Sequence, residues 1–204
     1  MTRVVVVSRT RMHGGVCVGA LVRDDMRMIR LCAPDGSRAQ PHEAPYRIGD
    51  VWDLEFEDAP FVVPPHVEDV ILHSGRFVAP QSGLGRYLRP RVEVYGGGPD
   101  VLFEGNLRFT PSGRGFIARE AVPSMSVGFW APDAALSGSP GPKTAFRYEN
   151  HGVIRTIAYV ADADPPSDIQ AGSLLRVSLA RWWAGEDGFG EERCWLQLSG
   201  VIPE

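Results

Sequence analysis

Period-two alternation of apolar and polar side chains is the feature that most limits what this chain can fold into. In V-W-D-L-E-F-E, residues 51–57, the apolar Trp52, Leu54 and Phe56 alternate with acidic residues. Such alternation is typical of a strand with one face in the core and the other in water. No stretch shows a sustained period of 3.6, and 23 glycines and 17 prolines punctuate the sequence. The chain is therefore predicted to be all-β, with many short strands joined by turns.

The spacing of these strands predicts two OB-like small Greek-key barrels in tandem. Strands are expected over residues 3–9, 15–22, 26–33, 50–57 and 67–72, which is the inventory of one OB-type barrel. The segment 79–90 is rich in residues that break regular structure. We predict an N-terminal OB-like barrel over residues 1–80, a linker over 81–90 and a C-terminal OB-like barrel with longer loops over 91–204. Its strands are expected at residues 91–95, 101–109, 116–119, 125–130, 144–148, 153–160, 174–179 and 193–202, with one short helix at 179–184.

Charge and composition exclude some classes of protein. The formal net charge is −4 and the pI about 5.8, which argues against coating of nucleic acid through bulk charge. A local basic surface stays open, because the charge can be unevenly distributed. Of the 21 basic residues only Lys143 is a lysine, and we interpret this as coding bias of a GC-rich genome rather than selection of arginine for phosphate.

Cysteine usage and the first residues predict a cytoplasmic address. Cys17, Cys32 and Cys194 are odd in number and lie in apolar, strand-like contexts, as expected of buried, reduced thiols. The four valines at positions 4–7 are too few for a signal peptide or a membrane-spanning helix. No membrane association is expected.

A basic segment breaks into two glycines in S-R-T-R-M-H-G-G-V-C-V-G, residues 8–19. Arg9, Arg11, His13, Gly14 and Gly15 supply guanidinium groups and exposed backbone N–H groups, which an anion-binding loop needs. In an OB barrel the loop between the first two strands flanks the ligand face. The alternative is a plain hairpin turn whose glycines permit positive φ while the arginines stay solvated. Both readings are open at this point.

A second basic cluster surrounds an aromatic residue in the predicted linker. In R-Y-L-R-P-R, Tyr87 lies among Arg86, Arg89 and Arg91. Single-stranded nucleic acid is bound by aromatic side chains that stack on bases and by cations that contact the backbone. Tyr87 is thus a candidate stacking residue and the three arginines are candidate phosphate contacts. Simple solubilisation of an exposed linker explains the same residues equally well.

Adjacent aromatic residues near the C-terminus supply the other stacking candidates. Trp182 and Trp183 follow each other directly, and neighbouring residues of a strand point to opposite faces. One of the two is therefore expected to be exposed, where it can stack on a base or contact a partner. Trp52 and Trp195, which alternate with polar residues, are assigned to the core instead.

No catalytic signature is found, so no catalytic residue, metal site or cofactor is predicted. The histidines lack metal-ligand spacing, and the cysteines sit in runs too apolar for activated thiolates. Acidic pairs fall in predicted turns or at strand ends, where such residues are common anyway. These pairs are Asp24-Asp25, Glu57-Asp58 and Glu186-Asp187.

Two patches resemble a known family. The opening V-V-V-V-S-R-T-R-M, with G-G-V-C-V-G-A-L and R-M-I-R-L after it, is similar to the start of bacterial proteins described as dual OB-domain proteins. The closing L-L-R-V-S-L-A-R-W-W-A and E-E-R-C-W-L-Q-L-S-G are similar to the family's ending. The resemblance covers the two ends of the chain. It implies two OB-like barrels and a role in binding nucleic acid or nucleotides, suspected in bacterial defence, and it transfers no catalytic residue.

Non-catalytic binding of nucleic acid or a nucleotide-like ligand is therefore the function we expect. The alternative is an adaptor that binds another protein, such as an effector encoded nearby. A third reading is a metal-dependent nuclease or hydrolase that uses the acidic turns.

Overall fold

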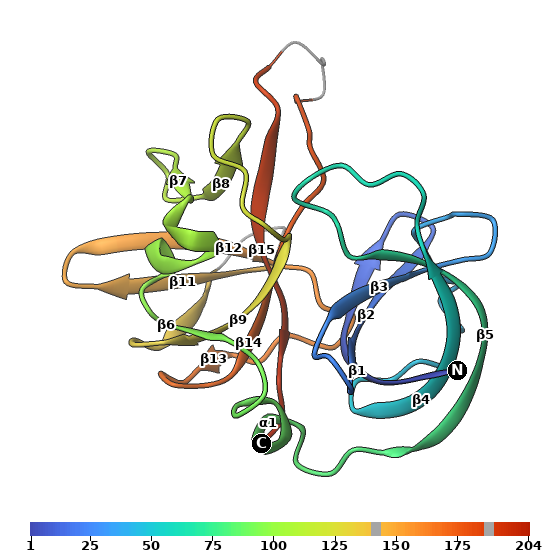
Figure 1. Ribbon diagram of the computed structural model, residues 1–204. Coiled ribbons are helices and arrows are strands. Elements are labelled where there is room, and N and C mark those ends of the chain that lie inside the picture. Colours follow the sequence, from blue (N-terminus) through green and yellow to red (C-terminus); the bar gives the residue numbers. More distant parts are fainter. Residues whose placement is uncertain (140–143, 186–189) are drawn as a thin grey trace.

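The first half of the chain forms a closed barrel. The computed structural model describes residues 1–139, 144–185 and 190–204. Within residues 1–80, all of which are described, five strands pair in the order β1-β2-β3-β5-β4, and β4 pairs again with β1 (Figure 1). Only β3 and β5 run parallel. The strands are β1 (Thr2–Met12), β2 (Gly15–Val22), β3 (Met28–Cys32), β4 (Asp50–Asp58) and β5 (Asp69–Pro80).

Alternation along β1 explains why all four of its valines are buried. Val4 and Val6 point into the barrel and pack with residues of β2, β3 and β4. Val5 and Val7 point the other way, into an apolar cluster that also contains Phe129 from the second half. A strand buried on both faces reads as a continuous apolar run. The barrel is therefore joined to the second half through its first strand.

The second half forms an open, half-barrel sheet. Among the described residues its main path is β13-β10-β11-β12-β15-β14-β9-β6, and the β7-β8 hairpin branches from β15 through β8. β15 lies at the centre of the molecule between the two halves (Figure 1). The strands are β6 (Val94–Gly97), β7 (Arg108–Phe109), β8 (Gly115–Ala118), β9 (Val127–Pro132), β10 (Leu136–Ser139), β11 (Ala145–Asn150), β12 (Val153–Tyr159), β13 (Asp168–Ile169), β14 (Leu175–Leu179) and β15 (Arg193–Val201). The all-β prediction is confirmed.

The predicted linker, residues 81–90, contains the helix α1 (Leu84–Leu88). Leu84 and Leu88 are four residues apart and thus share one helix face, and both are buried in the apolar cluster between the halves. Burial of this face explains how a segment of breaker residues holds a helical turn. No helix among the described residues is long and apolar enough to cross a membrane.

Two predicted elements of the second half are wrong, the strand at residues 101–109 and the helix at residues 179–184. The first part of the strand expected at residues 101–109 is replaced by the 3₁₀ turns η1 (Pro99–Val101) and η2 (Phe103–Gly105), and only β7 remains of it. Its apolar residues reach the core from these turns, as Phe103 does. The helix expected at residues 179–184 is absent, because Trp183 exchanges backbone hydrogen bonds with Arg193 in an extended arrangement. The longer loops predicted in the second half contain the strands β10 and β13, and residues 140–143 lie outside the described residues.

Candidate anion-binding site

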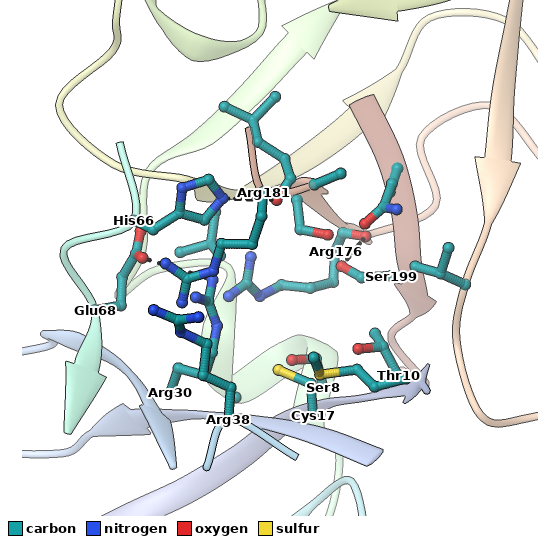
Figure 2. A pocket seen from close by; sticks show the side chains of 18 of the residues that line it. Ser8, Thr10, Cys17, Arg30, Arg38, His66, Glu68, Arg176, Arg181 and Ser199 are labelled. Atoms are coloured by element: carbon teal, nitrogen blue, oxygen red, sulfur yellow. Dashed lines mark hydrogen bonds and ion pairs between the residues drawn. The ribbon is translucent and has the colours of Figure 1, made fainter. Parts of the chain in front are cut away.

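A cavity of about 210 Å³ lies between the two halves. One wall comes from β1, β2, β3 and the loop before β5, and the other comes from β14, β15 and the residues just after β14 (Figure 2). In OB barrels the face of strands 2 and 3, flanked by the loops between strands 1 and 2 and between strands 4 and 5, binds the ligand. Here Met12, Cys17 and Arg30 represent that face and the first loop, and His66 represents the second. The cavity therefore occupies the usual OB ligand position, covered by the second half.

Positive charge dominates the cavity. Of the described residues, five arginines line it: Arg11, Arg30, Arg38, Arg176 and Arg181. The carboxylates that contact them within the cluster are those of Glu68 and Asp69. In Figure 2 the guanidinium groups of Arg30, Arg38, Arg176 and Arg181 gather near the centre of the cavity. The site therefore has an excess of positive charge over the carboxylates that pair with it.

Asp69 holds three of these arginines in place. Its Oδ1 accepts a hydrogen bond from Arg30 Nη1 at 2.9 Å, and its Oδ2 accepts one from Arg181 Nη2 at 2.5 Å. Arg38 Nε lies 3.6 Å from Oδ2, and the Asp69 side chain is only 4% exposed. Burial and the nearby charge of Arg30 lower the pKa of Arg181. One buried carboxylate thus compensates guanidinium groups from β3, from the following loop and from the second half.

Glu68 ties the two halves together at the cavity wall. Its carboxylate accepts hydrogen bonds from Ser126 N at 2.6 Å and from Ser126 Oγ at 2.8 Å. Arg30 Nη2 donates to the same Ser126 Oγ at 3.1 Å and lies 3.7 Å from Glu68 Oε2. Both oxygens of Glu68 therefore accept hydrogen bonds from Ser126, while its negative charge faces Arg30 and Arg176.

Arg176 is a buried arginine of the site that forms no ion pair with a carboxylate among the described residues. The residue is 2% exposed, and its Nη1 donates to the carbonyl oxygen of Val177 at 2.8 Å. Its Nε has no hydrogen-bond partner, and among the described residues no carboxylate forms an ion pair with it. Burial lowers the pKa of Arg176 to about 10, so the side chain still carries its charge at neutral pH. A buried, charged and partly unpaired guanidinium marks a candidate functional site.

His66 is buried neutral in the same wall. It is 1% exposed, and its Nε2 lies 3.2 Å from the carbonyl oxygen of Leu179. A carbonyl only accepts, so Nε2 carries the hydrogen and Nδ1 of the neutral ring is an acceptor. Burial, with the nearby charges of Arg181 and Arg30, lowers the pKa of His66 to about 4. Protonation of this ring is therefore strongly opposed at neutral pH.

The two arginines of the basic loop, Arg9 and Arg11, make different contacts. Arg9 forms an ion pair with Asp162 at 2.8 Å and donates to the carbonyl oxygens of His42, Ala44 and Tyr46, which holds that loop against the second half. Arg11 lines the cavity, and its Nε donates to Ala161 O at 2.9 Å. A phosphate contact by Arg9 stays a prediction, and Arg11 is better placed for one.

The turn residues of this loop have a structural explanation. Gly14 has φ of 82°, the left-handed region that favours glycine, and His13 is exposed beside it. At Gly15 a Cβ atom would collide with the backbone oxygen of Gln40. Cys17, predicted to be buried, is half-buried and lines the cavity, whereas Cys32 and Cys194 are buried.

The second predicted cluster lies on α1 and its flanks, and its members are not among the residues that line the cavity. Arg89 pairs with Glu204 at 2.8 Å. Arg91 lies over the Tyr87 ring at 4.4 Å, Arg23 lies over the same ring at 4.9 Å, and Arg86 is exposed on the helix. The Tyr87 ring is therefore already stacked against guanidinium groups. The two basic clusters do not line one common site.

One of the two adjacent tryptophans, Trp182 and Trp183, is exposed, as predicted from their neighbouring positions. Trp183 is 50% exposed. Trp182 is half-buried, donates from Nε1 to the carbonyl oxygen of Pro64 at 2.8 Å, and lies under Arg119 at 3.8 Å. Stacking on a base by either ring stays a prediction.

The acidic pairs do not form a metal site in the part of the chain that the structure describes. No group of three or more His, Cys, Asp or Glu side chains there could hold a metal ion. Glu186 and Asp187 lie outside the described residues.

The cavity arginines that no sequence pattern singled out as site residues are Arg30, Arg38, Arg176 and Arg181. Arg30 and Arg176 stand inside the apolar runs M-I-R-L-C and L-L-R-V-S-L. Arginine is almost never fully buried without a partner. An arginine at a core position of a predicted strand therefore indicates a buried charged site.

Fold and site together define an all-β protein whose OB-type barrel has its ligand face covered by a second β unit. The chain belongs to the dual OB-containing domain family, whose sequence model matches residues 2–201. The predicted family is thereby confirmed. No curated protein matches the chain. OB-fold domains commonly bind nucleic acids or other ligands.

Proposed function

We propose that this protein binds a phosphate-bearing ligand, nucleic acid or a nucleotide, in the cavity between its two halves, and that it does so without catalysis. The observation that carries the proposal is Arg176, which is buried at the OB ligand face without a carboxylate partner among the described residues. A buried charge costs several kcal/mol unless it is compensated. An anionic ligand in the cavity supplies that compensation.

The size of the cavity limits how much of the ligand it encloses. Its volume of about 210 Å³ is below the roughly 300–1,000 Å³ of pockets for drug-sized molecules. The cavity therefore receives an anionic group, and the rest of the ligand extends toward the exposed arginines at its edge. Arg11 and Arg38 are these arginines, and the Arg38 side chain is 53% exposed.

Replacement of both edge arginines tests this proposal. Because Arg11 and Arg38 are exposed, the double variant Arg11→Gln, Arg38→Gln is expected to fold and to bind a fluorescein-labelled single-stranded octanucleotide at least tenfold more weakly at low salt. Fluorescence anisotropy measures the Kd. The matched control is Arg147→Gln, an exposed arginine that pairs with Glu149 and is not among the residues that line the cavity, and this variant should leave Kd unchanged. Absence of binding by the unaltered protein, or equal weakening by the control, contradicts the proposal.

An adaptor function has separate support in an exposed apolar surface. Phe61 is 89% exposed and Trp183 is 50% exposed, and the hydrogen bond from Trp182 to Pro64 holds their two segments together. Tryptophan is enriched among residues that dominate protein interfaces. The double arginine variant separates the two functions, because it leaves this surface intact. A partner from a bacterial defence system belongs to this second proposal, and the genes adjacent to this one test it.

A further inference from the structure

We infer that the cavity selects a terminal phosphate group, either of a free nucleotide or of a phosphorylated strand end, over the internal phosphodiesters of a strand. The inference rests on the proposed function, since it names the chemical group that the same site recognises. Charge, geometry and size each support it.

Charge balance favours a group with more than one negative charge. Five arginines line the cavity, and the guanidinium groups of Arg30, Arg38, Arg176 and Arg181 gather near its centre. The carboxylates that face them are those of Glu68 and Asp69. Three cationic charges are therefore left over. A phosphomonoester carries about −1.5 to −2 charges at pH 7, whereas each internal phosphodiester of a strand carries one. The terminal group therefore compensates more of this excess than one internal phosphodiester does.

The arrangement of donors favours a group with several free oxygens. Arg30 reaches the cavity from β3, Arg176 from β14 and Arg181 from the residues after β14, so guanidinium groups approach from opposite walls (Figure 2). A terminal phosphate presents three oxygens that accept hydrogen bonds. An internal phosphodiester presents two, because its other oxygens bond to the flanking sugars. A terminal phosphate can therefore accept hydrogen bonds from more of the guanidinium groups on the two walls than an internal phosphodiester can.

The size of the cavity adds a steric reason. An internal phosphodiester brings a nucleoside on each side, whereas a terminal phosphate is attached through one bond. The cavity holds about 210 Å³, less than a site for one drug-sized molecule. One end of a ligand fits this space better than the middle of a chain.

Isothermal titration calorimetry of matched ligands tests the inference. The probes are one single-stranded DNA octamer with a 5′-phosphate, with a 3′-phosphate or with hydroxyl groups at both ends, together with adenosine monophosphate and adenosine. We expect at least one phosphorylated octamer, or adenosine monophosphate, to bind at least tenfold more tightly than its dephosphorylated counterpart. Preference for an octamer identifies a strand end as the source of the phosphate, and preference for the mononucleotide identifies a free nucleotide.

Variants connect the preference to the cavity. Arg176→Met, and independently Arg181→Gln, should remove the preference for phosphate, whereas Arg89→Gln on α1 should preserve it. If all octamers bind equally tightly and adenosine monophosphate binds no better than adenosine, the terminal-phosphate inference is wrong while the proposed function stands. If none of the probes binds, both are wrong. Folding of each variant is checked by its thermal unfolding transition, and the two cavity variants provide independent readings.

Discussion

Replacing Asp69 with asparagine is expected to lower the free energy of unfolding by about 3–5 kcal/mol, the usual cost of removing one partner from a buried ion pair. Asparagine keeps the shape of the side chain but loses its charge. Arg30 and Arg181 then lose the carboxylate that accepts their hydrogen bonds at 2.9 and 2.5 Å, and Arg38 loses its nearest carboxylate. Urea denaturation at pH 7, monitored by tryptophan fluorescence, measures the loss.

A matched exposed pair serves as the control for this experiment. Glu192 accepts a hydrogen bond from Arg119 at 2.6 Å, but both side chains are nearly half exposed, so Glu192→Gln should cost less than about 1 kcal/mol. Inorganic phosphate should also stabilise Asp69→Asn more than the unaltered protein, because the variant has a larger excess of positive charge and a bound anion stabilises the folded state. Equal stabilities of the two variants would contradict the role given to Asp69.

Acidification from pH 6.5 to pH 4 is expected to remove about 3 kcal/mol of stability through His66 alone. Burial lowers the pKa of His66 from 6.5 to about 4 in the folded protein. Between these values the unfolded chain binds a proton that the folded chain does not, so the free energy of unfolding falls as the pH falls. The contribution is complete above pH 6.5 and is lost by about pH 4. Urea denaturation at several pH values within this range measures the slope.

The variant His66→Gln isolates this contribution. The glutamine amide can still donate to Leu179 O but does not titrate, so the variant should lose stability less steeply with falling pH, by up to about 1.4 kcal/mol per pH unit. His13→Gln changes an exposed histidine and should leave the slope unaltered. A His66→Gln slope equal to that of the unaltered protein would show that His66 is not buried neutral.

The first barrel was largely predictable because its strands carry local information. Alternation around Trp52 and Leu54 placed β4, and the glycine pair at 14–15 placed the turn between β1 and β2. The strand predicted at residues 67–72 overlaps β5 but ends too early. Residues 73–80 of β5 are exposed, so they lack the buried face that produces an alternating pattern.

The second half was less predictable because its core draws on turns and distant strands. Phe103 is buried from a 3₁₀ turn, and β12 pairs in parallel with β15 about forty residues further along the chain. The prediction of a short helix at residues 179–184 is wrong because Trp183 forms an antiparallel bridge with Arg193. No local sequence pattern reveals this pairing. Long-range pairing of this kind is not encoded in any single window of sequence.

Of the arginines that line the cavity, only Arg11 is among the residues predicted from the sequence to bind a ligand. Arg11 lines the cavity, as the position of an OB ligand loop predicts, whereas Arg9 is engaged in the fold. Arg30 and Arg176 were recognisable as charges in apolar strands. What no sequence pattern could reveal is that the second half covers the first barrel's ligand face and brings these arginines together.

Anomalous diffraction from crystals grown with tungstate tests the central claim most directly, because tungstate is a tetrahedral dianion that stands in for a terminal phosphate. We predict an anomalous peak in the cavity with oxygens about 3 Å from guanidinium nitrogens of Arg176 and of Arg30 or Arg181. Tungstate bound only at exposed arginines such as Arg147, with no peak in the cavity, would contradict the assignment of this cavity as an anion-binding site.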